Sequence, residues 1–147
     1  MTKILFFCSP IGLGHATRDL AIINQMELES YKIFSGSSAI QFFQRNDIEA
    51  NDVYSPPKFE VQNGKLEKSL KWLWSYYKYY KNCKEISNDI IRKEEPELII
   101  SDEDFASIAV AQERGIRNIV ITDIPVSYTH LRAHETRGNL VCRLLLE

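Results

Sequence analysis

The sequence contains few of the residues that mark secreted, metal-binding or membrane proteins. Three cysteines, at positions 8, 83 and 142, are spaced neither as metal ligands nor as an even set of disulfides. This usage is typical of a reducing compartment, and we expect a cytoplasmic protein without a protein-bound metal. No apolar run approaches the roughly 20 residues of a membrane-spanning helix. The apolar part of the N-terminus is also too short for a secretory signal.

An excess of either charge is also missing. The 147 residues include 18 Lys and Arg against 20 Asp and Glu, a formal net charge of −2. A polybasic nucleic-acid binder is excluded as the default, because neutralising phosphates requires clustered basic side chains. The length fits one compact domain at roughly 150 residues per domain, and it is sufficient to bury a hydrophobic core without disulfides.

Residues 126–147 differ in character from the rest of the chain. They resemble a translated sequencing-library adapter along almost their whole length. Segments of foreign origin are excluded before a fold is argued, so we take residues 1–125 as the domain and 126–147 as a non-native tail. His130 and His134 then have no part in a site, and His15 is the one histidine left. The alternative is a native amphipathic C-terminal helix.

Residues 1–125 are predicted to alternate between strands and helices. Short apolar runs predict strands at 3–8, 31–36, 48–54, 97–101 and 118–122. Helical spacing predicts helices at 16–26, after a capping Ser37 or Ser38, at 66–93, and at 105–111 with Gly115 as its cap. Residues 58–65 are expected to form an exposed loop with a turn at Asn63-Gly64.

This alternation favours an α/β fold, an open Rossmann-like parallel sheet with helices on both faces. Ligands bind such sheets at the carboxyl ends of the strands. Two loops with suggestive chemistry follow strands there, at residues 9–15 and 102–104.

The glycine loop is the most informative segment. Gly12 and Gly14 resemble the start of a dinucleotide fingerprint, but Thr17 stands where a third glycine belongs. The second strand also ends without the acid that would hold a ribose. What remains is Gly-x-Gly-His followed by Arg18, at the start of a helix that directs its N–H groups toward a ligand. The helix dipole favours a neutral His15, the form that a general base needs.

The segment 9–18, SPIGLGHATR, is similar to the N-terminal motif of GT-B glycosyltransferases. The nearest groups resemble the lipid-linked N-acetylglucosaminyltransferase of cell-wall synthesis and the UDP-glucuronosyltransferases. Residues 97–111 resemble the family's fourth-strand region, which is an apolar strand, an Asp and a small-residue helix. Residues 115–120 fit the strand that follows.

The resemblance implies a partial N-terminal, acceptor-side domain, with the donor-binding C-terminal domain absent from this chain. It implies sugar transfer from a nucleotide-sugar, a UDP-sugar by the nearest groups, to a hydroxyl of a lipid, glycan or small molecule. No further cofactor is implied. His15 would take the acceptor proton and Asp102 would orient it, with Asp104 as the fallback partner. Gly12, Gly14, Arg18 and Asp104 would contact substrate, and Arg18 could instead pair with Asp102. We expect the chain alone to be inactive.

Other interpretations stay open at this point. His15 could make a structural hydrogen bond, Asp102 could cap the helix near Phe105, and Arg18 could be a surface residue. The aromatic residues 72–80 could be core packing, or they could contact a hydrophobic acceptor or a membrane surface. Cys8 and Cys83 are expected to be buried and inert. The alternative function is a non-catalytic nucleotide- or phosphate-binding module, or part of a nucleotide-sugar epimerase or a reductase.

Overall fold

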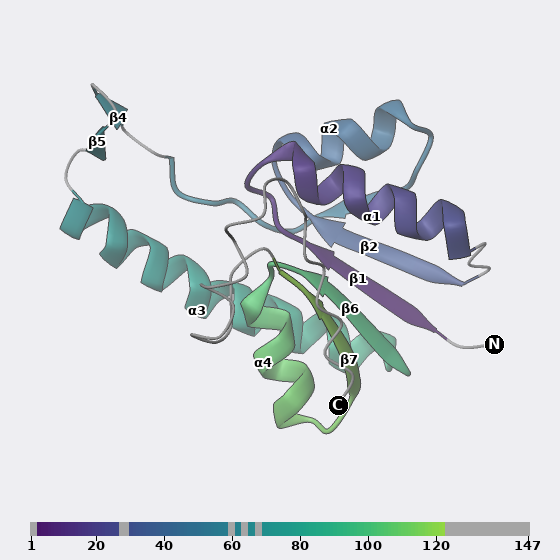
Figure 1. The fold of residues 1–147 in the computed structure, drawn as a ribbon. Helices are drawn as coiled ribbons and strands as arrows, with labels where there is room; N and C mark the ends of the chain where they lie inside the picture. The colour runs from purple at the N-terminus through teal and green to yellow at the C-terminus, as the bar shows by residue number, and fades with distance from the viewer. Residues whose placement is uncertain (1–2, 27–29, 59–60, 63–64, 67–68, 123–147) are drawn as a thin grey trace, which may run out of the picture.

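A computed structural model of the chain describes residues 3–26, 30–58, 61–62, 65–66 and 69–122. The predicted tail and the boundary before it lie outside these residues. Strands and helices alternate along the described chain (Figure 1).

A five-stranded parallel sheet forms the centre of the molecule. Its order is β3-β2-β1-β6-β7, and every pair is parallel. The strands are β1 (Ile4–Cys8), β2 (Tyr31–Ser35), β3 (Ala50–Asp52), β6 (Leu98–Asp102) and β7 (Arg117–Ile121). All five residues of β1 are buried, because this strand lies mid-sheet with helices on both faces. The predicted fold class is confirmed.

Two helices cover each face of the sheet. α1 (Leu13–Met26) and α2 (Ser38–Arg45) lie on one face, and α3 (Ser69–Glu94) and α4 (Phe105–Glu113) lie on the other (Figure 1). Successive side chains of β1 point to opposite faces. Phe6 therefore packs in the core under α1 and α2, and Phe7 packs in the core under α3 and α4.

Two local predictions were wrong. Ser37 occupies the position before α2 but makes no side-chain cap bond, because its backbone is in the left-handed region with φ 55°. Residues 58–65 are not all loop: β4 (Val61–Gln62) and β5 (Lys65–Leu66) pair antiparallel. An Asn-Gly turn favours such a hairpin, although residues 63–64 themselves lie outside the described residues. The glycine cap of α4 is confirmed at Gly115, with φ 66°.

The predicted apolar stripe of α3 is buried along only part of its length. Leu70, Leu73 and Tyr77 belong to that stripe, yet they are 83%, 57% and 50% exposed. The C-terminal half packs on the sheet and on α4 through Cys83 and Ile91. The N-terminal end of the helix extends past the sheet (Figure 1), where Leu70, Leu73 and Tyr77 lie largely exposed. Within the described chain, no helix combines the length and apolarity needed to cross a bilayer.

Candidate functional site

The two predicted loops meet at the carboxyl edge of the sheet. β1 and β6 are neighbours, and Cys8 is the register partner of Asp102. The Ser9 amide donates to the Asp102 carbonyl at 2.9 Å, which continues the ladder one residue beyond β1. The chain leaves β1 toward β2 on one side and reaches β6 on the other, so this edge is the switch point at which open α/β sheets bind ligands.

The glycine loop ends and α1 begins three residues earlier than the sequence predicted. Gly12 has φ 89°, a backbone conformation that side chains with a Cβ rarely adopt. α1 then begins at Leu13, which places His15 in its first turn. A Cβ on Gly14 would meet no atom within 4 Å, so this glycine leaves open space beside the loop.

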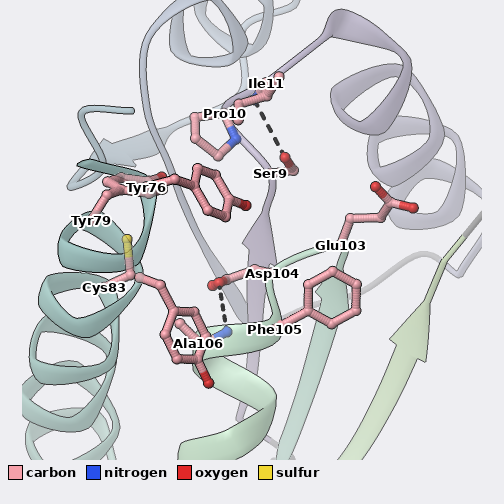
Figure 2. A pocket seen from close by; sticks show the side chains of 11 residues that line it. Ser9, Pro10, Ile11, Tyr76, Tyr79, Cys83, Glu103, Asp104, Phe105 and Ala106 are labelled. Carbon is pink, nitrogen blue, oxygen red and sulfur yellow. Dashed lines mark hydrogen bonds between the residues drawn. The ribbon is translucent and has the colours of Figure 1, made fainter. Parts of the chain in front are cut away.

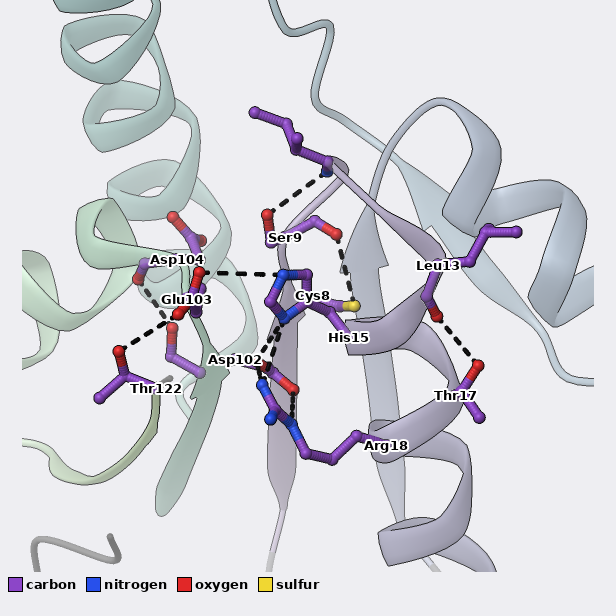
Figure 3. Close-up of polar contacts among 12 residues, drawn as sticks. Cys8, Ser9, Leu13, His15, Thr17, Arg18, Asp102, Glu103, Asp104 and Thr122 are labelled. Carbon is purple, nitrogen blue, oxygen red and sulfur yellow. Dashed lines mark hydrogen bonds and ion pairs between the residues drawn. The ribbon is translucent and has the colours of Figure 1, made fainter. Parts of the chain in front are cut away.

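His15, Arg18 and Asp102 form one cluster (Figure 3). His15 Nδ1 lies 2.9 Å from Asp102 Oδ1. Arg18 donates from Nε to Asp102 Oδ2 at 2.8 Å and from Nη2 to Oδ1 at 2.7 Å, a two-pronged pair with a fully buried carboxylate. The predicted pairing of His15 with Asp102 is therefore present. Arg18 contacts Asp102, the second of its two predicted roles.

The cluster fixes the tautomer of the imidazole. Two groups lie near His15 Nδ1. Arg18 Nη2 is 3.2 Å away and can only donate a hydrogen bond, whereas Asp102 Oδ1 is closer, at 2.9 Å. An ionised Asp102 can only accept, so Nδ1 carries the proton and donates to Asp102. Nε2 is then the nitrogen left to act as a base.

Charges around the cluster set its protonation states. Burial alone raises the pKa of Asp102, but hydrogen bonds from Arg18 and His15 outweigh it and hold the pKa below its ordinary value. The hydrogen bond to Asp102 raises the pKa of His15 above its ordinary value, against a smaller opposing effect of burial. The contact with Asp102 thus acts against the predicted effect of the helix dipole, which favours the neutral ring.

Sequence reasoning missed Glu103 as a member of the site. Its Oε2 lies 3.8 Å from His15 Nε2, on the side of the ring away from Asp102. Thr122 Oγ1 donates to its Oε1 at 3.3 Å. Glu103 has φ 52°, an uncommon value for a residue with a side chain. The sequence indicated only that Glu103 lies between two aspartates. Its position did not predict that its side chain points toward His15.

Asp104 has a different role from Asp102. It is buried, and its Oδ1 accepts from the Ala106 amide at 3.2 Å, which caps α4. Its Oδ2 accepts from the Tyr54 hydroxyl at 2.7 Å, and that hydroxyl also bonds Ser87 of α3 at 2.8 Å. The alternative that Asp102 caps this helix is wrong, since Asp104 does so. Asp104 is also not the partner of His15, because the loop holds Asp102 there.

A pocket lies beside Glu103 (Figure 2). Glu103 lines it and also neighbours His15 Nε2, whereas His15, Arg18 and Asp102 are not among the lining residues. Three segments line it: the glycine loop, the face of α3 that carries Tyr76 and Tyr79, and the loop from Glu103 to Phe105. Its lining includes four aromatic residues, Tyr76, Tyr79, Tyr80 and Phe105, and two carboxylates, Glu103 and Asp104. Among the aromatic residues 72–80, Tyr79 and Tyr80 therefore pack against the core, and both line the pocket together with Tyr76.

Sequence reasoning also missed a buried aspartate on α1. Asp19, one turn along α1 from His15, is completely buried, and neither of its carboxylate oxygens has a hydrogen-bond partner. Burial, and then the charge of Asp102, raise its pKa to about 8. Cys8 and Cys83 are free and buried, as predicted, and burial raises the pKa of both thiols. Among the described residues, no cluster of three His, Cys, Asp or Glu could hold a metal.

The chain was compared with family models, with curated proteins and with solved structures. No family model matches the chain. A UDP-N-acetylglucosamine--N-acetylmuramyl-(pentapeptide) pyrophosphoryl-undecaprenol N-acetylglucosamine transferase from Clostridium botulinum (strain Alaska E43 / Type E3) is 26% identical over 111 residues, covering 74% of this chain and 29% of that protein.

Two solved structures align over most of the chain. The glycotransferase of kitacinnamycin has a TM-score of 0.65 at 13% identity, covering 89% of this chain and 32% of its own. The UDP-GlcNAc 2-epimerase of Neisseria meningitidis, bound to UDP-GlcNAc, has a TM-score of 0.58 at 14% identity, covering 90% and 35%.

The chain thus spans only about a third of the length of each of these proteins. At such identities, the structural likeness establishes the fold. The described residues have a truncated Rossmann-like α/β fold of the kind that makes up about a third of a GT-B glycosyltransferase chain.

Proposed function

We propose that this chain is the acceptor-side part of a glycosyltransferase that moves a sugar from a nucleotide-sugar, a UDP-sugar, to an acceptor hydroxyl. The observation that carries the proposal is the 2.9 Å contact between His15 Nδ1 and buried Asp102 at the ligand-binding edge of the sheet. The similarity to an N-acetylglucosamine transferase over three quarters of the chain supports it.

His15 is the general base in this proposal. Nδ1 is engaged with Asp102, so Nε2 takes the proton of the acceptor hydroxyl as the oxygen attacks the anomeric carbon. The attack comes from the face opposite the leaving nucleoside diphosphate and inverts the configuration. Asp102 stabilises the imidazolium that forms, in the way that a buried carboxylate does in hydrolase triads.

Arg18 positions this pair. Its two bonds to Asp102 keep the carboxylate ionised and fixed, although the carboxylate is fully buried. The raised pKa of His15 makes it a stronger base for the proton transfer. A donor diphosphate would need stabilising groups that a separate donor-binding domain supplies, and we infer that the 147-residue chain alone has no transfer activity.

The test is a substitution in the full-length protein that contains this chain. His15→Ala should lower the rate of sugar transfer by about 10²- to 10⁴-fold, the usual effect of losing a general base. Release of UDP and mass spectrometry of the glycosylated acceptor measure it. The matched control is Asp89→Asn on the exposed face of α3, which should keep the wild-type rate. A loss of less than tenfold for His15→Ala would return this residue to a structural role.

Epimerisation of a nucleotide-sugar is the second candidate, and the structural likeness to a UDP-GlcNAc 2-epimerase favours it. An epimerase changes the UDP-sugar without any acceptor. Proton NMR of the full-length protein incubated with UDP-GlcNAc alone separates the two functions. Transfer predicts no epimer, and accumulation of the C2 epimer would favour the second candidate.

Peripheral contact with a membrane at the cytoplasmic surface is part of the same proposal. Leu70, Leu73, Trp74 and Tyr77 are at least half exposed on the N-terminal half of α3. Lys78 lies over the Trp74 ring and Lys81 over the Tyr77 ring, so cations flank the apolar surface. This combination suits an interface with anionic lipid. In a sedimentation assay with vesicles of anionic phospholipid, the wild-type protein should be found in the pellet with the vesicles. The Trp74→Ser variant should remain in the supernatant.

A further inference from the structure

Glu103 lies on the side of His15 from which an acceptor must approach. Nδ1 of the ring is bonded to Asp102, so the reacting hydroxyl has to reach Nε2. Glu103 Oε2 stands 3.8 Å from Nε2, and the Glu103 side chain lines the pocket together with Tyr76 and Phe105. This distance is too long for a direct hydrogen bond. A group bonded to Nε2 would therefore also lie next to the Glu103 carboxylate.

The position of Glu103 is fixed by its backbone and its neighbours. Its φ of 52° is a left-handed conformation that is unfavourable for a residue with a side chain. The Glu103 amide donates to the Ile121 carbonyl at 3.0 Å, and the Thr122 hydroxyl donates to its carboxylate. Asp104, the next residue, is fixed by Tyr54. These contacts hold the Glu103 side chain at the pocket.

The chemistry of a carboxylate there defines the class of acceptor. The reacting hydroxyl has one proton and gives it to His15, so Glu103 must accept from a different donor. A second hydroxyl or an amine on the neighbouring carbon of the acceptor supplies one. An acid group in the same place would be repelled by Glu103 and would leave the carboxylate without that bond.

We propose that Glu103 determines acceptor specificity, selecting an alcohol with a second hydrogen-bond donor beside the reacting hydroxyl and rejecting one with an acid group there. This inference rests on the proposed function, because it takes the pocket beside His15 as the acceptor site. It adds the local chemistry of the acceptor, which the proposed function leaves open.

Two ring probes of matched size test the selection: trans-1,2-cyclohexanediol and trans-2-hydroxycyclohexanecarboxylate. Binding to the 147-residue chain is followed by NMR, through the shift of the His15 ring signals. The diol should bind about tenfold more tightly than the hydroxy acid, as expected for one hydrogen bond to a charged group. Glu103→Gln should reduce this preference to about twofold or less, because the amide still accepts but no longer repels the acid.

The control and a second variant keep the result interpretable. Glu97→Gln removes the same charge from an exposed residue just before β6, at the opposite end of that strand, and should keep the tenfold preference. Thr122→Val removes the hydroxyl that holds Glu103 and should reduce the preference without removing any charge. A tenfold preference that persists in Glu103→Gln, or no binding of either probe to the wild type, overturns the proposal.

The outcome is separable from that of the proposed function. The binding measurement needs neither a donor sugar nor turnover, so it can succeed in a protein that transfers nothing. Conversely, a full-length protein that glycosylates the diol and the hydroxy acid at equal rates would overturn the role of Glu103 and leave sugar transfer intact.

Discussion

Asp102 and Asp19 are both completely buried, yet their surroundings are opposite. Asp102, at the end of β6, accepts two bonds from Arg18 and lies against His15, and its pKa is held below the ordinary value. Asp19, on α1, has no hydrogen-bond partner at either oxygen, and burial together with the charge of Asp102 raises its pKa to about 8. Both side chains are fully shielded from solvent, so the hydrogen-bonding and charged groups around each carboxyl decide which of the two is ionised.

This difference has a direct consequence for pH dependence. A carboxyl whose pKa is lowered on folding adds stability that is present at neutral pH and lost as the pH falls. A carboxyl whose pKa is raised on folding removes stability as the pH rises from about 4 toward 8. Asp102 therefore favours the folded chain at neutral pH, and Asp19 favours it in acid. The fold tolerates Asp19 because one proton neutralises it.

The largest effect is expected when Asp102 loses its arginine. Arg18→Met should lower the free energy of unfolding at pH 7 by about 3–5 kcal/mol, because a buried carboxylate loses its cation. Urea unfolding followed by circular dichroism measures this loss. The control is Arg92→Met, which breaks an exposed pair with Asp89 and should leave the urea midpoint unchanged. A loss near zero for Arg18→Met would mean that Asp102 does not depend on this partner.

Neutralising the other carboxylate should act in the opposite direction. Asp19→Asn mimics the protonated carboxyl, so it should abolish the loss of stability that the wild type shows between pH 5 and pH 9. The wild-type loss across this window is about 4 kcal/mol for a pKa raised to about 8. Unfolding at several pH values measures the slope, with the exposed Asp89→Asn as the control. Parallel pH profiles for Asp19→Asn and the wild type would show that Asp19 does not titrate in this range.

Removing both members of the Asp102 pair should cost less than removing one. Arg18→Met combined with Asp102→Asn leaves no uncompensated buried charge, so the expected loss is about 1–2 kcal/mol. A double-mutant cycle of urea unfolding measures the coupling between the two side chains. Additive losses would indicate that the two groups do not interact in the folded chain.

The smallest effect on stability is expected at the histidine. His15→Ala removes one bond to Asp102 and leaves both bonds from Arg18, so the loss should be about 1 kcal/mol at pH 6. Since folding raises the pKa of His15, this stabilisation decreases as the pH rises through that pKa. Unfolding at pH 6 and pH 9 tests the sign. A larger loss at pH 9 would contradict the raised pKa.

Much of the fold was predictable because it follows from local pattern. Short apolar runs such as β1, and loop signals such as the glycines before α1, predicted the order of the strands and helices. Because the sheet is parallel, the carboxyl ends of β1 and β6 lie at the same edge. The contact between His15 and Asp102 was reached only through the family resemblance, since 87 residues separate the two. The burial of α3 was not predictable from its stripe, because Leu70 and Leu73 continue the helical spacing of Ile86 and Ile90 and are nevertheless 83% and 57% exposed.

The sequence by itself determined the alternation of strands and helices, because apolar spacing and glycine conformation act over a few neighbouring residues. Only the tertiary structure decided which carboxylate is paired with a cation, which is left alone, and which faces the base. Nothing in the sequence distinguished Asp19 and Glu103 from other acidic residues, and the role of Asp102 was indicated only by the family resemblance. Their charge states and roles depend on side chains tens of residues away, brought within bonding distance by the sheet.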